Sequence, residues 1–145
     1  MKSKICISNF MRTHVLSINS NTTVQEAAKT MYENNLSSLL IEDDGKISGI
    51  VTERDISMAR YVFNSGSRST VKEIMTSPVV SIDPDSSILD AAELIDRKQI
   101  HKIPVIKDEK LMGIISATDL VMLFSTFEKE ELEKKFGYLI DNKTD

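Results

Sequence analysis

Residues 49–55 read GIVTERD, and residues 113–119, which lie 64 positions further along the chain, read GIISATD. The same offset aligns residues 11–56 with residues 75–120 without a gap. Identical pairs in this alignment include Met11/Met75, Ala27/Ala91, Gly49/Gly113 and Asp55/Asp119, and many other pairs keep their hydrophobic character. Chance does not hold a hydrophobic pattern in register over such a length, so the chain contains a duplicated unit.

Each copy begins with a turn that leads into a helix. Residues 19–23 (NSNTT) and residues 83–87 (DPDSS) are rich in residues that favour turns. In the first copy Thr23 and Glu26 have the spacing of a capping box, in which each side chain satisfies a backbone N–H at the start of a helix. Apolar residues then recur at helical spacing, as Val24, Ala27, Ala28 and Met31 in the first copy and Ile88, Ala91, Ala92 and Ile95 in the second. This spacing predicts an amphipathic helix in each copy.

A β-hairpin and a second helix are predicted to follow. Residues 39–41 and 47–51 are apolar stretches on either side of a turn, in which Gly45 suits a positive φ angle. The second copy repeats this order with strands at residues 103–106 and 111–115. With a short leading strand, each copy is a β-α-β-β-α unit, which gives an α/β (α+β) fold. One unit alone leaves an apolar sheet face uncovered, so we expect the two units to pack together through their sheets.

Three stretches carry a resemblance to a known family, namely residues 49–55, residues 113–119 and residues 101–105 (HKIPV). At these distances in a duplicated frame, they resemble the tandem cystathionine β-synthase (CBS) domain pair, also called a Bateman module. The resemblance places one repeat at residues 7–64, a linker at 65–71, a second repeat at 72–127 and a charged helical extension at 128–145.

The resemblance also implies an architecture and a ligand class. The two repeats of such a pair are related by pseudo-two-fold symmetry and leave two clefts at their interface. These clefts commonly bind adenosine-containing ligands, such as AMP, ADP, ATP or S-adenosylmethionine. Two modules often associate into a disc-like homodimer.

The two stretches that end in aspartate contain candidate ligand-binding residues. Thr52 and Asp55 in the first copy match Ser116 and Asp119 in the second. A carboxylate at the start of a helix accepts hydrogen bonds from ribose hydroxyls, while the nearby hydroxyl and the free helical N–H groups suit a phosphate. The same spacing is also that of an ordinary capping box, and the two roles are compatible.

A cationic pair, His101 and Lys102, precedes the predicted strand of the second copy, and the matching residues 37–38 of the first copy are serines. The family often places phosphate-binding basic residues there, where they form charge-assisted hydrogen bonds; a solvated strand end is the alternative. This difference predicts unequal sites, with the cleft of Asp119 binding an anionic nucleotide more tightly than the cleft of Asp55.

An adenine ring requires an apolar slot, and plain core packing is the alternative role of every residue proposed for it. The slot candidates are Ile18, Ile82, Val51 and Ile115. The complete predicted ligand-binding set is Ile18, Ser37, Ser38, Thr52, Arg54, Asp55, Ile82, His101, Lys102, Pro104, Ser116, Thr118 and Asp119.

Composition and motif content argue against several other classes. A net charge of −4 over 145 residues disfavours general binding to the nucleic-acid phosphate backbone. His14 and His101 have no Cys or His at metal-ligand spacing, and the sequence has no nucleophile elbow, P-loop or dinucleotide-binding motif. We therefore expect no metal, no required cofactor and no catalysis. The single Cys6, expected in an N-terminal strand, and the lack of an apolar run of roughly 18 residues favour a soluble cytoplasmic protein outside the membrane.

The sequence thus predicts a stand-alone regulatory module that senses an adenosine-containing ligand and modulates a partner. A ligand-free dimerisation scaffold and a nucleic-acid-associated regulator are the alternative hypotheses. Asp55 and Asp119 favour the sensor, because a scaffold has no need of a carboxylate at both equivalent positions. The extension at residues 128–145 is either a solvated end of the last helix or a partner-binding arm that includes residues 138–140.

Overall fold

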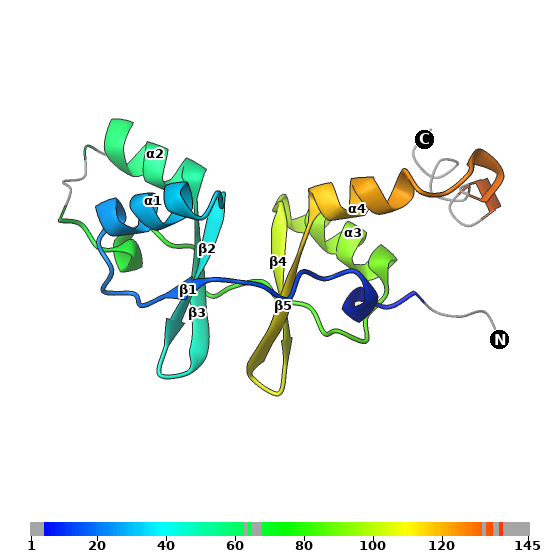
Figure 1. The fold of residues 1–145 in the computed structure, drawn as a ribbon, viewed down its shortest axis with the longest axis horizontal. Helices are drawn as coiled ribbons and strands as arrows, with labels where there is room; N and C mark the ends of the chain where they lie inside the picture. The colour runs from blue at the N-terminus through cyan, green and yellow to red at the C-terminus, as the bar shows by residue number, and fades with distance from the viewer. Residues whose placement is uncertain (1–4, 63, 65–67, 132, 135–136, 138–145) are drawn as a thin grey trace.

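The computed structural model describes residues 5–62, 64, 68–131, 133–134 and 137. Two units stand side by side, with their sheets facing each other and their helices on the outside (Figure 1). The first unit contains β1 (Ser17–Ile18), α1 (Val24–Glu33), β2 (Ser38–Asp43), β3 (Lys46–Thr52) and α2 (Glu53–Tyr61). The second contains α3 (Ile88–Lys98), β4 (Lys102–Lys107), β5 (Lys110–Ser116) and α4 (Ala117–Phe124). The predicted fold class is confirmed.

Both hairpins close with two-residue turns, so their strands are longer than the apolar stretches alone predict. β2 pairs antiparallel with β3, and β4 pairs antiparallel with β5. The turn residues Asp44 and Gly45 have φ angles of 51° and 76°, and Asp108 and Glu109 have φ angles of 51° and 63°. Positive φ at both central residues matches the twist of the paired strands. The second hairpin adopts this turn without a glycine.

The leading strand differs between the units. In the first unit β1 pairs parallel with β2, as predicted. In the second unit it is reduced to one parallel bridge between Ile82 and Val105. The strand expected at Cys6 is likewise a single bridge, to Ser87.

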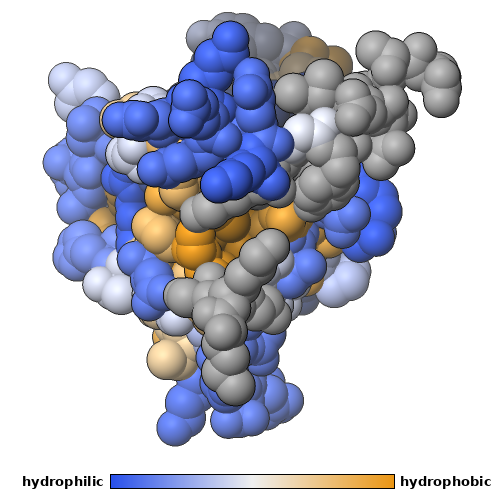
Figure 2. Space-filling view, turned by 90° about the vertical axis from the view of Figure 1, so that its right-hand side faces the viewer, coloured by the Kyte–Doolittle hydropathy of each residue, from blue (hydrophilic) through white to orange (hydrophobic). Residues whose placement is uncertain are grey.

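Each unit has its own apolar core beneath its helices. Ala27 and Ala91 of the predicted helical stripes are fully buried, and the remaining stripe residues are buried or partly buried. The predicted capping box is present, since the Glu26 N–H donates to Thr23 Oγ1 over 3.1 Å and the Thr23 N–H donates to Glu26 Oε2 over 3.2 Å. Figure 2 shows the end of the molecule at the second unit, where an apolar area lies among hydrophilic side chains.

The segment that precedes each unit packs in the apolar core of the other unit. The 3₁₀ turn η1 (Ile7–Asn9) precedes the first unit, yet Ile7 is fully buried in the core of the second. The 3₁₀ turn η2 (Val71–Glu73) precedes the second unit, yet Val71 is fully buried in the core of the first. Figure 1 shows the N-terminal segment running from β1 across to the far unit. Each core is therefore completed by a segment that leads into the other unit.

Two glycines allow these segments to cross closely over β5 and β3. Arg12 and Ile114 exchange two backbone hydrogen bonds of 2.9 Å, which brings the N-terminal segment onto β5. A Cβ atom on Gly113 would lie 2.6 Å from the carbonyl oxygen of Arg12, closer than real Cβ contacts. A Cβ atom on Gly49 would lie 2.9 Å from the carbonyl oxygen of Thr76 at the equivalent crossing. The occurrence of glycine at this position in both repeats thus has a steric reason.

The predicted C-terminal extension is described only in part. Residues 129–131 and 133–134 are helical, and Lys129 Nζ lies 3.9 Å from Glu133 Oε1. The apolar residues assigned to a partner-binding arm, at positions 138–140, lie outside the described residues. Among the described helices, none is long and apolar enough to cross a membrane.

The exchange of segments predicts that Ile7→Ala destabilises a core from outside its own unit. Removing a fully buried isoleucine side chain typically costs about 2–5 kcal/mol of unfolding free energy. Urea unfolding followed by circular dichroism measures this loss. Ser8→Ala, an exposed neighbour in the same turn, is the matched control and should cost at most about 0.5 kcal/mol. A loss below about 1 kcal/mol for Ile7→Ala would contradict the assignment of this segment to the core.

Candidate functional site

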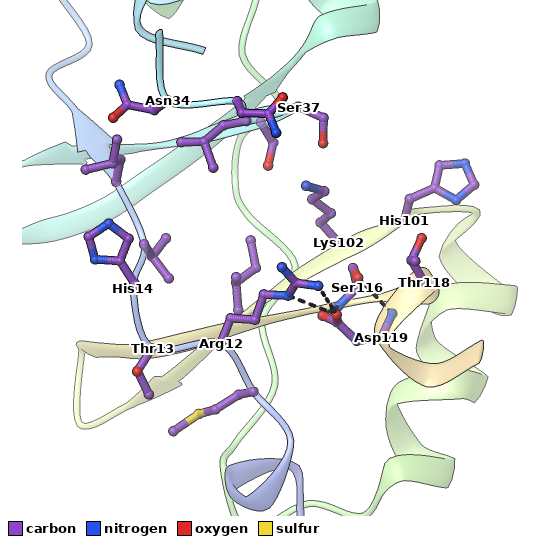
Figure 3. Close-up of a pocket in the computed structure, with 17 residues that line it drawn as sticks. Arg12, Thr13, His14, Asn34, Ser37, His101, Lys102, Ser116, Thr118 and Asp119 are labelled. Carbon is purple, nitrogen blue, oxygen red and sulfur yellow. Dashed lines mark hydrogen bonds and ion pairs between the residues drawn. The ribbon is translucent and has the colours of Figure 1, made fainter. Parts of the chain in front are cut away.

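A cleft of about 930 Å³ lies between the two units. Four element ends form it: the segment before β1, the loop between α1 and β2, the residues that lead into β4, and the junction of β5 with α4 (Figure 3). The lining residues are Met11, Arg12, Thr13, His14, Val15, Leu16, Asn34, Asn35, Leu36, Ser37, Ser38, His101, Lys102, Ile114, Ser116, Thr118 and Asp119. Both units and the crossing segment thus contribute to one cleft.

Asp119 is held at the start of α4 by a capping box with Ser116. The Ser116 N–H donates to Asp119 Oδ2 over 3.0 Å, and the Asp119 N–H donates to Ser116 Oγ over 3.0 Å. The side chain of Asp119 is only 11% exposed. The cap therefore fixes the orientation of this carboxylate through one oxygen and leaves the other, Oδ1, directed into the cleft (Figure 3).

Arg12 binds that second oxygen. Its Nη2 lies 2.9 Å from Asp119 Oδ1, and its Nε–H donates to the same atom over 3.0 Å. The Arg12 side chain remains 70% exposed. Arg12 was not among the predicted ligand-binding residues, because it precedes the motifs that carried that prediction. A signal was present in the repeat frame, in which Arg12 aligns with the uncharged Thr76.

Lys102 adds a second positive charge beside this ion pair. Burial lowers the pKa of the Lys102 ammonium below its ordinary value of 10.5, and the nearby Arg12 guanidinium lowers it further. The carboxylates of Asp119 and Glu53 act in the opposite direction. Glu53 begins α2 and Asp119 lies in the first turn of α4, so carboxylates from the helices of both units act on Lys102.

The structure brings together about half of the predicted ligand-binding residues. Ser37, Ser38, His101, Lys102, Ser116, Thr118 and Asp119 all line the cleft. Thr52, Arg54 and Asp55 lie at the junction of β3 and α2, and Ile18, Ile82 and Pro104 pack in or beside the cores, so these six do not line it. A ligand-binding role for any of the thirteen stays a prediction.

The loop comparison that predicted unequal sites needs a correction. Residues 37–38 and the pair His101 and Lys102 line the same cleft, because the equivalent loops of the two units meet at the interface. Their difference therefore does not separate one cleft from another. The asymmetry lies at Arg12, whose counterpart Thr76 carries no charge.

The carboxylate of Asp55 has a different environment. Asp55 Oδ2 accepts hydrogen bonds from the N–H and the Oγ1–H of Thr52, over 2.8 and 2.9 Å. Within the part of the chain that the structure describes, Asp55 has no ion-pair partner. Each of the two equivalent aspartates thus belongs to a capping box, but among the described residues only Asp119 is paired with an arginine.

The apolar wall of the cleft comes from outside the predicted set. Its aliphatic members are Val15, Leu16, Leu36 and Ile114. Val51 and Ile115, proposed for the adenine slot, are fully buried in the two cores. Among the described residues, no group of three or more His, Cys, Asp or Glu side chains is placed to hold a metal ion.

The sequence pattern that defines the CBS domain matches residues 7–61 and again residues 71–126. The chain therefore belongs to the CBS domain family, and its two units form a CBS domain pair. This confirms the family resemblance drawn from the repeated motifs.

Known relatives include a protein of similar length and an enzyme. The CBS domain-containing protein YhcV of Bacillus subtilis is 30% identical over 116 residues, which are 80% of this chain and 83% of YhcV. A homoserine O-acetyltransferase of Methanohalobium evestigatum is 33% identical over 123 residues, which are 83% of this chain but only 24% of that enzyme. The chain thus spans about a quarter of the second relative.

The fold is also that of a solved CBS domain pair. The crystal structure of the CBS domain pair of protein MJ0100 is 29% identical in sequence and has a TM-score of 0.77, and the match covers 84% of this chain and 97% of that one. That structure is a complex with 5′-methylthioadenosine and S-adenosyl-L-methionine.

The lowered pKa of Lys102 predicts that Lys102→Met stabilises the ligand-free protein at pH 7. The cost of holding the ammonium charged in the fold is present at neutral pH and disappears as the pH rises above 10.5. The melting temperature of Lys102→Met should therefore exceed that of the wild type at pH 7, and the difference should shrink toward pH 10.5. Lys110→Met, at an exposed position, is the matched control. A lower melting temperature for Lys102→Met at pH 7 would show that its charge stabilises the fold.

Proposed function

We propose that this CBS pair is a regulatory module that binds an adenosine-containing ligand in the cleft between its units. The ligand class comprises AMP, ADP, ATP and S-adenosylmethionine. Binding changes how the module meets a partner protein, and catalysis is not its role. The observation that carries the proposal is the Asp119 carboxylate, oriented by its cap and placed in a cleft that both units form.

The cleft offers a partner for each part of such a ligand. The carboxylate of Asp119 accepts hydrogen bonds from ribose hydroxyls. The aliphatic side chains of Leu16, Leu36 and Ile114 provide an apolar surface for adenine. Lys102 and Arg12 provide positive charge for a phosphate. The bound adenosyl ligands of the MJ0100 pair are consistent with this class.

Features of the cleft and of the charge disfavour the two alternatives, a ligand-free scaffold and a nucleic-acid-associated regulator. A ligand-free scaffold has no use for a pre-oriented carboxylate beside two cations in a cleft of about 930 Å³. A nucleic-acid-associated regulator would show binding that falls steeply with salt, and the net charge of −4 disfavours it.

A homodimer forms part of the proposal. Apolar side chains are exposed on the outer helices of both units: Met58 and Tyr61 on α2, and Val121 and Met122 on α4. Met58 and Met122 are equivalent in the repeat frame. A two-fold related second copy would cover both helices with one kind of contact.

A thermal-shift screen tests ligand binding. A ligand at about 100 times its dissociation constant stabilises a protein by roughly 2.7 kcal/mol. For a chain of this size, each kcal/mol raises the melting temperature by roughly 2–4 °C. At least one of AMP, ADP, ATP and S-adenosylmethionine should therefore raise it by several degrees. No shift with any of them at millimolar concentration would favour the scaffold.

Substitution of the two equivalent aspartates tests which cleft dominates. Asp119→Ala and Asp55→Ala each remove the N3 carboxylate of a capping box, and Asp119→Ala also removes the ion pair with Arg12, so the melting curve of each variant is recorded first. We expect Asp119→Ala to weaken the tighter binding event in calorimetry by about 1.5–3 kcal/mol, or roughly tenfold to a hundredfold. Asp55→Ala should leave that event unchanged. Equal losses in the two variants would contradict the assignment.

A further inference from the structure

Arg12 occupies the carboxylate oxygen that the proposed ligand requires. Its Nε donates to Asp119 Oδ1 over 3.0 Å, and its Nη2 lies 2.9 Å from the same oxygen. A guanidinium carries five N–H donors in a planar fork, so it engages a second anion while it stays near the first. The side chain is 70% exposed and lines the cleft, so these donors are accessible to a bound molecule.

A second cation, Lys102, lies near Arg12 in the cleft. Arg12 is paired with Asp119, and Lys102 lies on the same side of the cleft (Figure 3), where the carboxylates of Asp119 and Glu53 only partly offset the lowering of its pKa. The mutual repulsion of Arg12 and Lys102 contributes to the lowered pKa of Lys102. An anionic group between the two cations relieves that repulsion, whereas an uncharged group does not.

On the basis of the proposed function, we propose that Arg12 determines specificity by admitting adenosine ligands that carry a 5′-phosphate and disfavouring those without one. A ligand whose ribose binds Asp119 competes with Arg12 for Oδ1. When the ligand carries a phosphate, the displaced guanidinium gains a new charge-assisted, bidentate partner. An unphosphorylated nucleoside breaks the same ion pair and offers the guanidinium no new anionic partner.

The repeat provides an internal comparison for this residue. Thr76 stands 64 positions after Arg12 and makes the same kind of backbone pairing, with Ile50 over 3.1 and 2.9 Å. The substitution Arg12→Thr therefore installs a residue that the fold already accepts at an equivalent crossing. It removes the guanidinium and leaves the backbone pairing with Ile114 in place.

Calorimetry with AMP and 5′-methylthioadenosine tests the proposal, because these ligands share adenosine and differ at the 5′ position. We expect the wild type to bind AMP at least tenfold more tightly than 5′-methylthioadenosine. In Arg12→Thr this ratio should fall about tenfold or more, through weaker AMP binding and unchanged or tighter binding of 5′-methylthioadenosine.

Two further variants control the experiment. Lys46→Thr removes another exposed ion pair between the units, with Glu109 over 3.2 Å, and should change neither affinity. Arg12→Lys keeps the charge without the fork and should retain part of the preference for AMP. If Arg12→Thr fails to fold, as judged by its melting curve, Arg12→Lys supplies the comparison.

The binding data separate a failure of the role of Arg12 from a failure of the proposed function. Equal weakening of both ligands in Arg12→Thr would mean that Arg12 only supports the fold, and a wild type that binds both ligands equally would also overturn the specificity role. In either case the proposed function survives. If no adenosyl compound binds the wild type, the proposed function fails and the role of Arg12 fails with it.

Discussion

Two segments pass so close to Gly49 and Gly113 that no side chain fits at either glycine, and both apolar cores require this approach. A side chain at either glycine would collide with the backbone of the segment above it, at Thr76 or Arg12. With the approach open, those segments hydrogen-bond to β3 and β5 and carry Val71 and Ile7 into the cores. Neither unit has a complete core of its own, so the two units stabilise each other as well as covering each other's sheets.

The crossing also creates the chemistry of the cleft. It brings Arg12 into contact with Asp119, which is 107 positions away in the sequence. The scaffold around this contact is nearly symmetric, since both units place an aspartate in a capping box at the start of their last helix. The arginine is present at one crossing and absent from the other. The charge of Arg12, which is not duplicated at Thr76, thus makes the surroundings of Asp119 differ from those of Asp55.

The order of this site has an energetic consequence for ligand binding. The capping box holds Asp119 in position in the ligand-free protein, so the proposed ligand would not have to order this side chain. The positive charges of Arg12 and Lys102 lie in one cleft of a chain whose net charge is −4. The cleft therefore differs in the sign of its charge from the chain as a whole.

The duplicated frame could be predicted from the sequence because the chain matches itself at an offset of 64 positions. The helical stripes, the hairpins and the capping boxes could be predicted because each depends on spacing within a few residues. The sequence also led to Ser116, Lys102 and Asp119, since they belong to the repeated motifs. It did not lead to Arg12, to the aliphatic wall of the cleft or to the exchange of Ile7 and Val71. In two units with the same apolar pattern, a leading segment finds equivalent surfaces on either one, and local spacing does not distinguish them. Long-range contacts select the unit that each segment covers, and they therefore also select the charges that meet in the cleft.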